Sequence, residues 1–227
     1  MNTSRLAFDT PPYRISGAVY GTLLNSKAAL EALGDSVDAA PYKGAPKAPV
    51  LYLKPSNTLC GESEPLLVPV GTEALEVGAS LGIVIGRTAC NVQADKALDY
   101  VAGFTVVADL SVPHAKFYRP SLRFKVVDAT CAVGPSVVPT SAVKNPNELK
   151  VKVVVDGVVA QSASTSGMSR SVAKLVADVS EFMTLSPGDI LMLGVAAGAP
   201  TVRAGQTLSI EIEGVGTLSK KVEGAKA

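Results

Sequence analysis

The 227-residue sequence is short of charge, of aromatic residues and of histidine. Charged residues make up 18% and aromatic residues 5%; there is no tryptophan, and His114 is the single histidine. Its 21 Lys and Arg residues are scattered and balance 20 Asp and Glu residues, so no basic stripe predicts a nucleic-acid partner. A single histidine, which would have to serve every role, gives no support for a Ser-His-Asp or Cys-His nucleophile.

Long apolar runs are absent as well. The longest, such as Leu81–Ile85 and Ile190–Leu193, are far shorter than a membrane-spanning helix of about 20 residues. The first residues, Met1–Ser16, contain no apolar segment of signal-peptide length. The cysteines are few, odd in number and without C-x-x-C spacing: Cys60, Cys90 and Cys131. We therefore expect free thiols in a reducing cytoplasm and no membrane partner.

Apolar material is plentiful, and most of it is patterned for strands. Hydrophobic residues make up 47% of the chain, with a mean hydropathy of +0.30. From Pro49 onward, short apolar runs lie between prolines, glycines and turn residues, which is typical of strands. The strongest hairpin signal is Asp156-Gly157 between Leu149–Val155 and Val158–Ser162. A surface with so little charge also indicates burial in an oligomer.

Three short helices are expected among the strands. Ser26–Leu33 has a capping serine at its start and Gly34 at its end, and Asp95–Val101 forms a second helix. In Ser169–Phe182 the apolar residues, including Phe182, fall on one face. The predicted fold class is therefore mostly β (α+β) with a few short helices.

Seven strings in order carry a resemblance to a known family. They are YLKPSNTLCG (52–61), SLGIVIGRTACNV (80–92), ALDYVAGFTVVADLS (97–111), FYRPSLRFKVVDATCAVGPSVV (117–138), VVVDGVVAQS (153–162), SEFMTLSPGDILMLG (180–194) and GQTLSIEIEGVGTLSKKV (205–222). Together they resemble the fumarylacetoacetate hydrolase superfamily over nearly the whole chain. The resemblance implies a mixed β-roll or sandwich, with residues 1–48 as an N-terminal lead and lid segment and 49–227 as the catalytic-type domain.

Within that superfamily, the FYRP…K…D arrangement is most similar to isomerase/decarboxylases of 4-hydroxyphenylacetate catabolism. These act on unsaturated keto or hydroxy dicarboxylates, and they occur as two homologous halves or as two separate subunits. The sequence is similar to the first half, standing as a separate subunit. The resemblance thus implies a small dicarboxylate substrate and a homologous partner.

The family's metal site is where this sequence departs from the pattern. Active relatives hold Mg²⁺ or Mn²⁺ through a Glu-x-Glu pair on one strand face and a later Asp, because such cations prefer oxygen ligands. In the family register Gly78 and Ser80 replace the two glutamates, and Asp109 matches the third ligand. Glu76 lies on the same strand face two residues too early. We therefore expect this chain to bind no metal; Asp109 is open to a second reading, as an acid that satisfies backbone donors.

Other family positions predict a ligand pocket. Lys125 matches a lysine that binds the substrate carboxylate or oxyanion, and Asp128 is expected to orient it; both are the catalytic candidates. The substrate-binding candidates are Tyr118, Arg119, Arg123, Lys54 and Gly194. Each of these charged residues has a structural alternative, as a surface charge, an ion pair or, for Lys54, a turn anchor.

Three further positions bear on catalysis. Ala29 stands where the family lid carries a histidine, and Val195 follows Gly194 where relatives carry a threonine hydroxyl. His114 is either a hydrogen-bonded surface residue or a group that titrates near neutral pH beside Asp109.

Two functions remain open at this point. One is a non-catalytic subunit, in a homodimer or in a hetero-oligomer with a metal-bearing homologue. The other is an independent isomerase/decarboxylase that uses Asp109, His114 and Lys125 with little or no metal. Acylpyruvate hydrolysis and oxaloacetate decarboxylation are further superfamily reactions, and the missing metal ligands argue against both.

Overall fold

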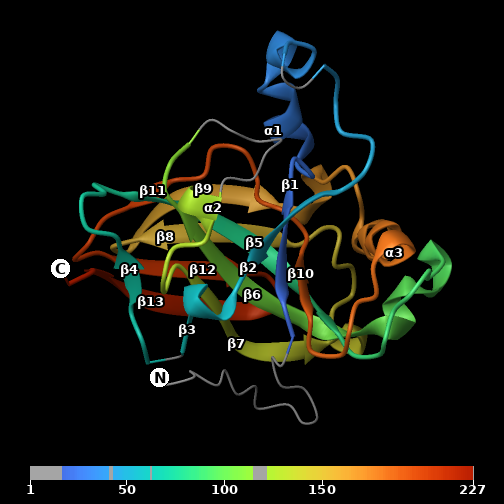
Figure 1. The fold of residues 1–227 in the computed structure, drawn as a ribbon. Coiled ribbons are helices and arrows are strands. Elements are labelled where there is room, and N and C mark those ends of the chain that lie inside the picture. Colours follow the sequence, from blue (N-terminus) through green and yellow to red (C-terminus); the bar gives the residue numbers. More distant parts are fainter. Residues whose placement is uncertain (1–16, 41–42, 62, 115–121, 227) are drawn as a thin grey trace.

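The fold of the chain is built mainly from strands in two sheets (Figure 1). A computed structural model describes residues 17–40, 43–61, 63–114 and 122–226. The strands are β1 Val19–Leu23, β2 Val50–Lys54, β3 Leu59–Cys60, β4 Leu66–Val68, β5 Leu75–Ile85, β6 Val101–Ser111, β7 Cys131–Pro139, β8 Lys150–Val155, β9 Val158–Ser164, β10 Ile190–Met192, β11 Thr201–Val202, β12 Thr207–Ile212 and β13 Gly216–Gly224. This confirms the mostly β prediction.

Helices are few and short. The α-helices are α1 Lys27–Glu31, α2 Leu122–Lys125 and α3 Val172–Phe182, and the 3-10 helices are η1 Gly34–Val37, η2 Ser56–Thr58, η3 Ala94–Tyr100, η4 Thr140–Ala142 and η5 Thr165–Gly167. None of the helices in the described ranges has the length and apolar character needed to cross a membrane.

Both sheets are mixed. The larger runs β2-β1-β10-β5-β6-β7-β3, with β11 added on β5, and the smaller runs β4-β13-β12-β8-β9. The pairs β1–β10, β3–β7 and β4–β13 are parallel, whereas the long central pair β5–β6 is antiparallel. This topology brings residues from distant parts of the sequence onto one sheet.

The two faces of β5 contribute to different cores, because successive side chains of a strand point to opposite faces. Leu81 and Ile83 belong to the main core, together with residues of the smaller sheet and α3. Val84 belongs to a second core that also contains Tyr52 of β2 and Val133 of β7. Since β2 and β7 lie near opposite ends of the larger sheet, that sheet curls around the second core.

Two local predictions are confirmed and one is wrong. Asp156 and Gly157 have φ values of 49° and 79° and connect β8 to β9, as expected for a tight hairpin turn. Helix α3 begins after Ser171, whose side chain accepts a hydrogen bond from Lys174 N, and its apolar face is buried. Phe182, however, is 60% exposed, because it is the last residue of the helix and lies beyond the covered face.

The N-terminal segment leaves the sheet at Asn25 and projects from the body. β1 is an internal strand between β2 and β10, whereas α1 extends beyond both sheets (Figure 1). Asn25 is 1% exposed, and its side-chain nitrogen donates to Leu193 O at 2.7 Å and to Arg170 O at 3.1 Å. Its side-chain oxygen accepts from Arg170 N at 2.8 Å. The base of the projection is therefore fixed by one side chain.

Replacing Asn25 with alanine is expected to lower the free energy of unfolding by about 2–3 kcal/mol. The reason is that Leu193 O would lose its partner in a buried position, and Arg170 would lose contacts to its backbone. Urea unfolding followed by circular dichroism measures the change. Ser36→Ala, in the exposed part of the same projection, serves as the control and is expected to change the stability by less than about 0.5 kcal/mol.

The three cysteines are free and differ in exposure. Cys60 and Cys131 are buried and Cys90 is exposed. Burial raises the pKa of the Cys131 thiol to about 12 and raises that of Cys60, so neither forms the reactive thiolate readily. We expect a thiol reagent to label Cys90 alone in the native chain and all three cysteines after denaturation, as measured by mass spectrometry. Native labelling of Cys131 would contradict this placement.

Candidate functional site

A buried carboxylate between two lysines forms the floor of the candidate site. Asp109 of β6 lies directly opposite Gly78 of β5, and its side chain is fully buried. Lys54 Nζ is 3.0 Å from Asp109 Oδ1, and Lys125 Nζ is 3.5 Å from Oδ2. The hydroxyl of Tyr52 donates a short hydrogen bond to the same Oδ2. One negative charge is thus shared by two ammonium groups.

Lys54 uses its ammonium group within the protein. Its side chain is 0% exposed, and Nζ donates to Lys125 O at 2.6 Å, to Leu110 O at 3.2 Å and to Thr130 Oγ1 at 3.2 Å. With these three bonds formed, its contact with Asp109 Oδ1 is an ion pair without an aligned hydrogen bond. An ammonium group has three donors, so Lys54 ties the end of α2 to β6 beneath the cavity.

Tyr52 reaches Asp109 because the strand opposite leaves room for its ring. Gly21 is its register partner in β1, and a Cβ on Gly21 would come within 2.0 Å of the Tyr52 ring. On the other side, Lys125 Nζ lies 4.7 Å from the centre of the ring, within the range of a cation–π contact. Tyr52 therefore orients both members of the Lys125–Asp109 pair.

The charges of the lysines set the ionisation of this cluster. Burial alone would raise the pKa of Asp109, but Lys125 and Lys54, together with the hydrogen bond from Tyr52, hold that pKa below its ordinary value. Burial, reinforced by the negative charge of Asp109, raises the pKa of Tyr52 well above its ordinary value. At neutral pH, Asp109 is therefore a carboxylate and Tyr52 a neutral donor.

Lys125 stands on α2 at the edge of the cavity. It is 9% exposed, and its Nζ also donates to Ser111 Oγ at 3.3 Å. The expected orientation of Lys125 by Asp128 is wrong: Asp128 is exposed and accepts from Asn57 Nδ2 at 2.6 Å, whereas the carboxylate beside Lys125 is Asp109.

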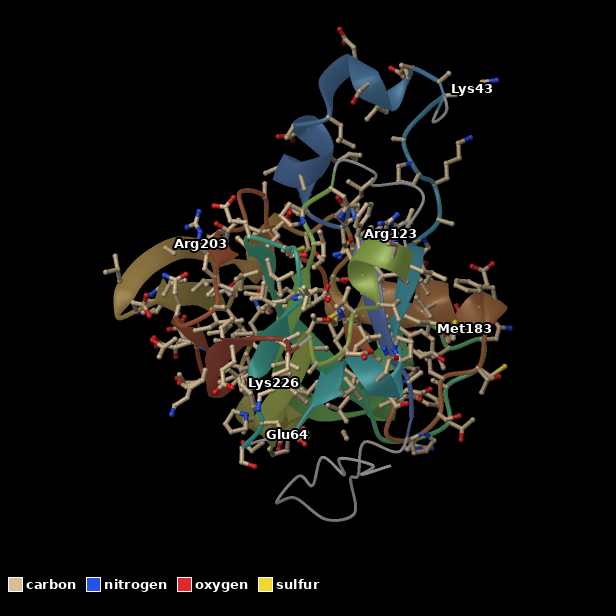
Figure 2. All side chains as sticks on the ribbon, turned by 60° about the vertical axis from the view of Figure 1, so that its left-hand side comes forward. Lys43, Glu64, Arg123, Met183, Arg203 and Lys226 are labelled. Atoms are coloured by element: carbon tan, nitrogen blue, oxygen red, sulfur yellow. The ribbon has the colours of Figure 1, made fainter. Side chains whose placement is uncertain are left out.

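Of the arginine and tyrosine candidates for substrate binding, the structure describes only Arg123. Arg123 is exposed on α2, below the projecting N-terminal segment (Figure 2). Tyr118 and Arg119 lie outside the described residues.

Above this cluster lies a cavity of about 410 Å³. Its apolar lining includes Ala29, Ala32 and Leu33 of the projection and residues 195–199. Its polar members are Thr22, Tyr52, Glu76, Ser111, His114 and Lys125. A cavity of this size with a few convergent polar groups is typical of a site for a small ligand.

The described residues do not fit the family's divalent cation. A Cβ on Gly78 would lie 2.7 Å from Asp109 O and 3.0 Å from Val195 Cγ2, so a side chain has no room there. Ser80 Oγ accepts the backbone N–H of Gly194 at 3.1 Å. Within 17–40, 43–61, 63–114 and 122–226, no group of three His, Cys, Asp or Glu side chains could hold a metal.

Gly194 contributes through its backbone. Its φ of 131° places it in a conformation that side chains rarely adopt, and a Cβ there would lie 3.1 Å from Asn25 Cβ. It thereby links β10 to the apolar wall that starts at Val195. The residue after it, where the family resemblance implies a threonine hydroxyl, is the apolar Val195.

Sequence reasoning missed Tyr52 and Ser111. Tyr52 and Lys54 occupy alternate positions of β2, so the strand period places both on one face, and that signal was available. Ser111 ends β6 two residues after Asp109 and shares its face for the same reason. The strand period does not show which carboxylate these side chains meet, because that depends on the curl of the larger sheet.

The comparisons with known proteins agree on the family. The family model "Fumarylacetoacetate (FAA) hydrolase C-terminal" matches residues 18–223. A 4-hydroxyphenylacetate degradation bifunctional isomerase/decarboxylase of Escherichia coli is 32% identical over 208 residues, covering 92% of this chain and 47% of that protein. The chain therefore spans about half the length of this curated relative.

Solved structures extend the likeness to the whole fold. 5-Carboxymethyl-2-hydroxymuconate delta-isomerase from Mycobacterium smegmatis superposes with a TM-score of 0.78 at 29% identity, covering 94% of this chain and 81% of that one. Maleylpyruvate hydrolase from Sphingobium sp. SYK-6, in complex with manganese(II) ion and pyruvate, gives 0.75 at 27% identity, covering 92% and 71%.

Proposed function

The chain belongs to the fumarylacetoacetate hydrolase family, and from this premise we propose that it is a subunit of an isomerase/decarboxylase of 4-hydroxyphenylacetate catabolism. It binds no catalytic metal itself and works with a homologous, metal-bearing partner subunit. The pocket accepts a small unsaturated keto or hydroxy dicarboxylate. We place this assembly in the cytoplasm, in keeping with the three free cysteines.

The observation that carries the proposal is the β5–β6 pair at Gly78 and Asp109. Gly78 has no room for a side chain, and Asp109 is already neutralised by two ammonium groups. A carboxylate held in this way is a poor ligand for a hard cation, which needs several free oxygen atoms. The remaining cavity, with Lys125 at its edge, still suits a small carboxylate.

The role of a partner rests on one further observation. The E. coli relative is about twice as long as this chain, which matches 47% of it. A metal-bearing homologue in the same assembly would supply the metal site that β5 and β6 of this chain lack.

An independent, metal-free enzyme is the second candidate, because Lys125 and His114 both line the cavity. Its residues would bind the dicarboxylate through the Lys125 ammonium and exchange protons at His114. In this case Lys125→Ala would remove turnover by the isolated chain.

Calorimetric titration with Mn²⁺ tests the metal half of the proposal. We expect no saturable binding by the isolated chain at millimolar Mn²⁺ (about 1 mM, the weak end of protein cation sites). A metal-bearing family member titrated in the same buffer is the positive control. Tight binding by this chain would overturn the proposal.

Turnover of the unsaturated keto-dicarboxylate tests the partner half. We expect activity when the chain is mixed with a metal-bearing homologue, and none from the chain alone. Metal-free turnover by the isolated chain that is lost in Lys125→Ala would favour the independent enzyme instead.

A further inference from the structure

His114 has its ring fixed at the cavity wall by two contacts. Its Nδ1 lies 2.9 Å from Val112 O. Its ring stacks on Phe124 with 5.2 Å between the ring centres and an angle of 27° between the planes. The backbone N–H of Val112 donates in turn to Phe124 O at 3.0 Å, which ties the loop after β6 to α2. The imidazole thus has one preferred orientation.

The partner of Nδ1 determines the tautomer of the neutral ring. A carbonyl oxygen only accepts hydrogen bonds, so Nδ1 carries the proton in this contact. In the neutral imidazole the other nitrogen, Nε2, is then an acceptor with a free lone pair. His114 lines the cavity, as does Lys125, which follows the stacked Phe124 in the sequence.

From this arrangement we infer that His114 is a ligand-recognition residue whose Nε2 accepts a hydrogen bond from a hydroxyl of the bound carboxylic acid. Lys125 supplies the cation for the carboxylate, and His114 supplies the acceptor for the hydroxyl. The site therefore selects hydroxy or enol acids over acids of the same skeleton that lack the hydroxyl. The inference rests on the proposed function only in placing a small dicarboxylate in this cavity.

The preference for a hydroxyl follows from the hydrogen-bond donors and acceptors that each side chain offers to the ligand. Both Lys125 and a protonated imidazole donate, so neither would distinguish a hydroxyl from another acceptor. A neutral imidazole fixed as the Nδ1–H tautomer offers an acceptor, which a ligand without an O–H or N–H cannot use. Only a ligand with an O–H or N–H gains the hydrogen bond to Nε2, and this gives the discrimination.

Binding of malate and succinate by the isolated chain tests the inference. The two dicarboxylates share a carbon skeleton and differ in one hydroxyl. In metal-free buffer at about pH 8, we expect malate to bind about three- to tenfold more tightly than succinate, in the range of one hydrogen bond. His114→Asn should remove this preference, because its amide can still donate to Val112 O but has no group at Nε2.

His114→Gln, which places an amide oxygen near the position of Nε2, should keep part of the preference. Succinate is the internal control: its affinity should be the same in wild type and both variants if the pocket is intact. Equal affinities of wild type for malate and succinate, a preference that persists in His114→Asn, or no saturable binding of malate would each overturn the inference.

Nuclear magnetic resonance tests the tautomer without any substitution. Because His114 is the single histidine of the chain, its ring nitrogens give one assignable set of signals. We expect a protonated Nδ1 and an unprotonated Nε2 in the free chain, with the Nε2 signal shifting on addition of malate and less on addition of succinate. A protonated Nε2 in the free neutral ring would overturn the inference. None of these measurements involves metal or turnover. Binding of both acids without the hydroxyl preference overturns this inference alone, whereas binding of neither acid also counts against the dicarboxylate pocket of the proposed function.

Discussion

Replacing Asp109 with asparagine is expected to lower the free energy of unfolding by about 3–5 kcal/mol. The side chain of Lys54 is 0% exposed and lies 3.0 Å from Asp109 Oδ1. In the variant, the ammonium groups of Lys54 and Lys125 would remain buried together without a negative charge between them, and the Tyr52 hydroxyl would lose its charged acceptor. Urea unfolding at about pH 7, with circular dichroism, measures the loss.

The chain offers a matched control in Glu211→Gln. This change also turns a carboxylate paired with a lysine into an amide, but Lys152 and Glu211 are 47% and 50% exposed. Exposed ion pairs contribute little, so we expect a loss of less than about 1 kcal/mol. Equal losses in Asp109→Asn and Glu211→Gln would contradict the buried cluster.

The pH dependence of this contribution has a definite sign. The pKa of Asp109 is lower in the folded chain than its ordinary value of about 3.9. The stabilisation is therefore fully present above that ordinary value and is lost as the pH falls through the lower folded pKa. The difference in stability between wild type and Asp109→Asn should be constant from about pH 7 to pH 5 and should shrink only below the ordinary value. Unfolding curves collected across this range measure it.

The parts of the fold that local patterns specify were predictable from the sequence. The Asp156-Gly157 turn needs positive φ at both residues, and the sequence places there two residue types that tolerate it. Ser26 and Ser171 cap their helices as serine side chains commonly do. Phe182 was misplaced because helical periodicity indicates a face but not where the covering sheet ends.

The candidate site was predictable only in part, because its contacts join strands that are distant in the sequence. Lys125 and Asp109 were both recognised as site residues, but their pairing was not. The sequence brings Asp128 closer to Lys125 than Asp109, and proximity along the chain favoured the wrong carboxylate. Lys125 meets Asp109 because α2 folds back onto the end of β6, where Val112 N–H donates to Phe124 O. Lys54 meets it because the curl of the larger sheet carries β2 to β6, and no local pattern encodes that closure.

The second large effect is expected where the family's metal ligands are missing. Installing both glutamates, Gly78→Glu with Ser80→Glu, should lower the free energy of unfolding by more than about 3 kcal/mol, because it buries two further carboxylates. A Cβ on Gly78 already comes within 2.7 Å of Asp109 O, so even Gly78→Ala should cost about 1–3 kcal/mol. Urea unfolding of the three proteins in metal-free buffer measures both losses.

The control for the added charge is Gly167→Glu. Gly167 is exposed, has open space around its Cβ position and has no positive φ, so a glutamate there should change the stability by less than about 1 kcal/mol. Calorimetry with Mn²⁺ then asks whether the two glutamates restore metal binding. We expect that they do not, because Lys54 and Lys125 still neutralise Asp109, and a cation would have to displace two ammonium groups from its third ligand. A stable double variant that binds Mn²⁺ tightly would contradict this expectation. It would show that the strands can still form the family's metal site and that Gly78 and Ser80 alone prevent metal binding in the natural chain.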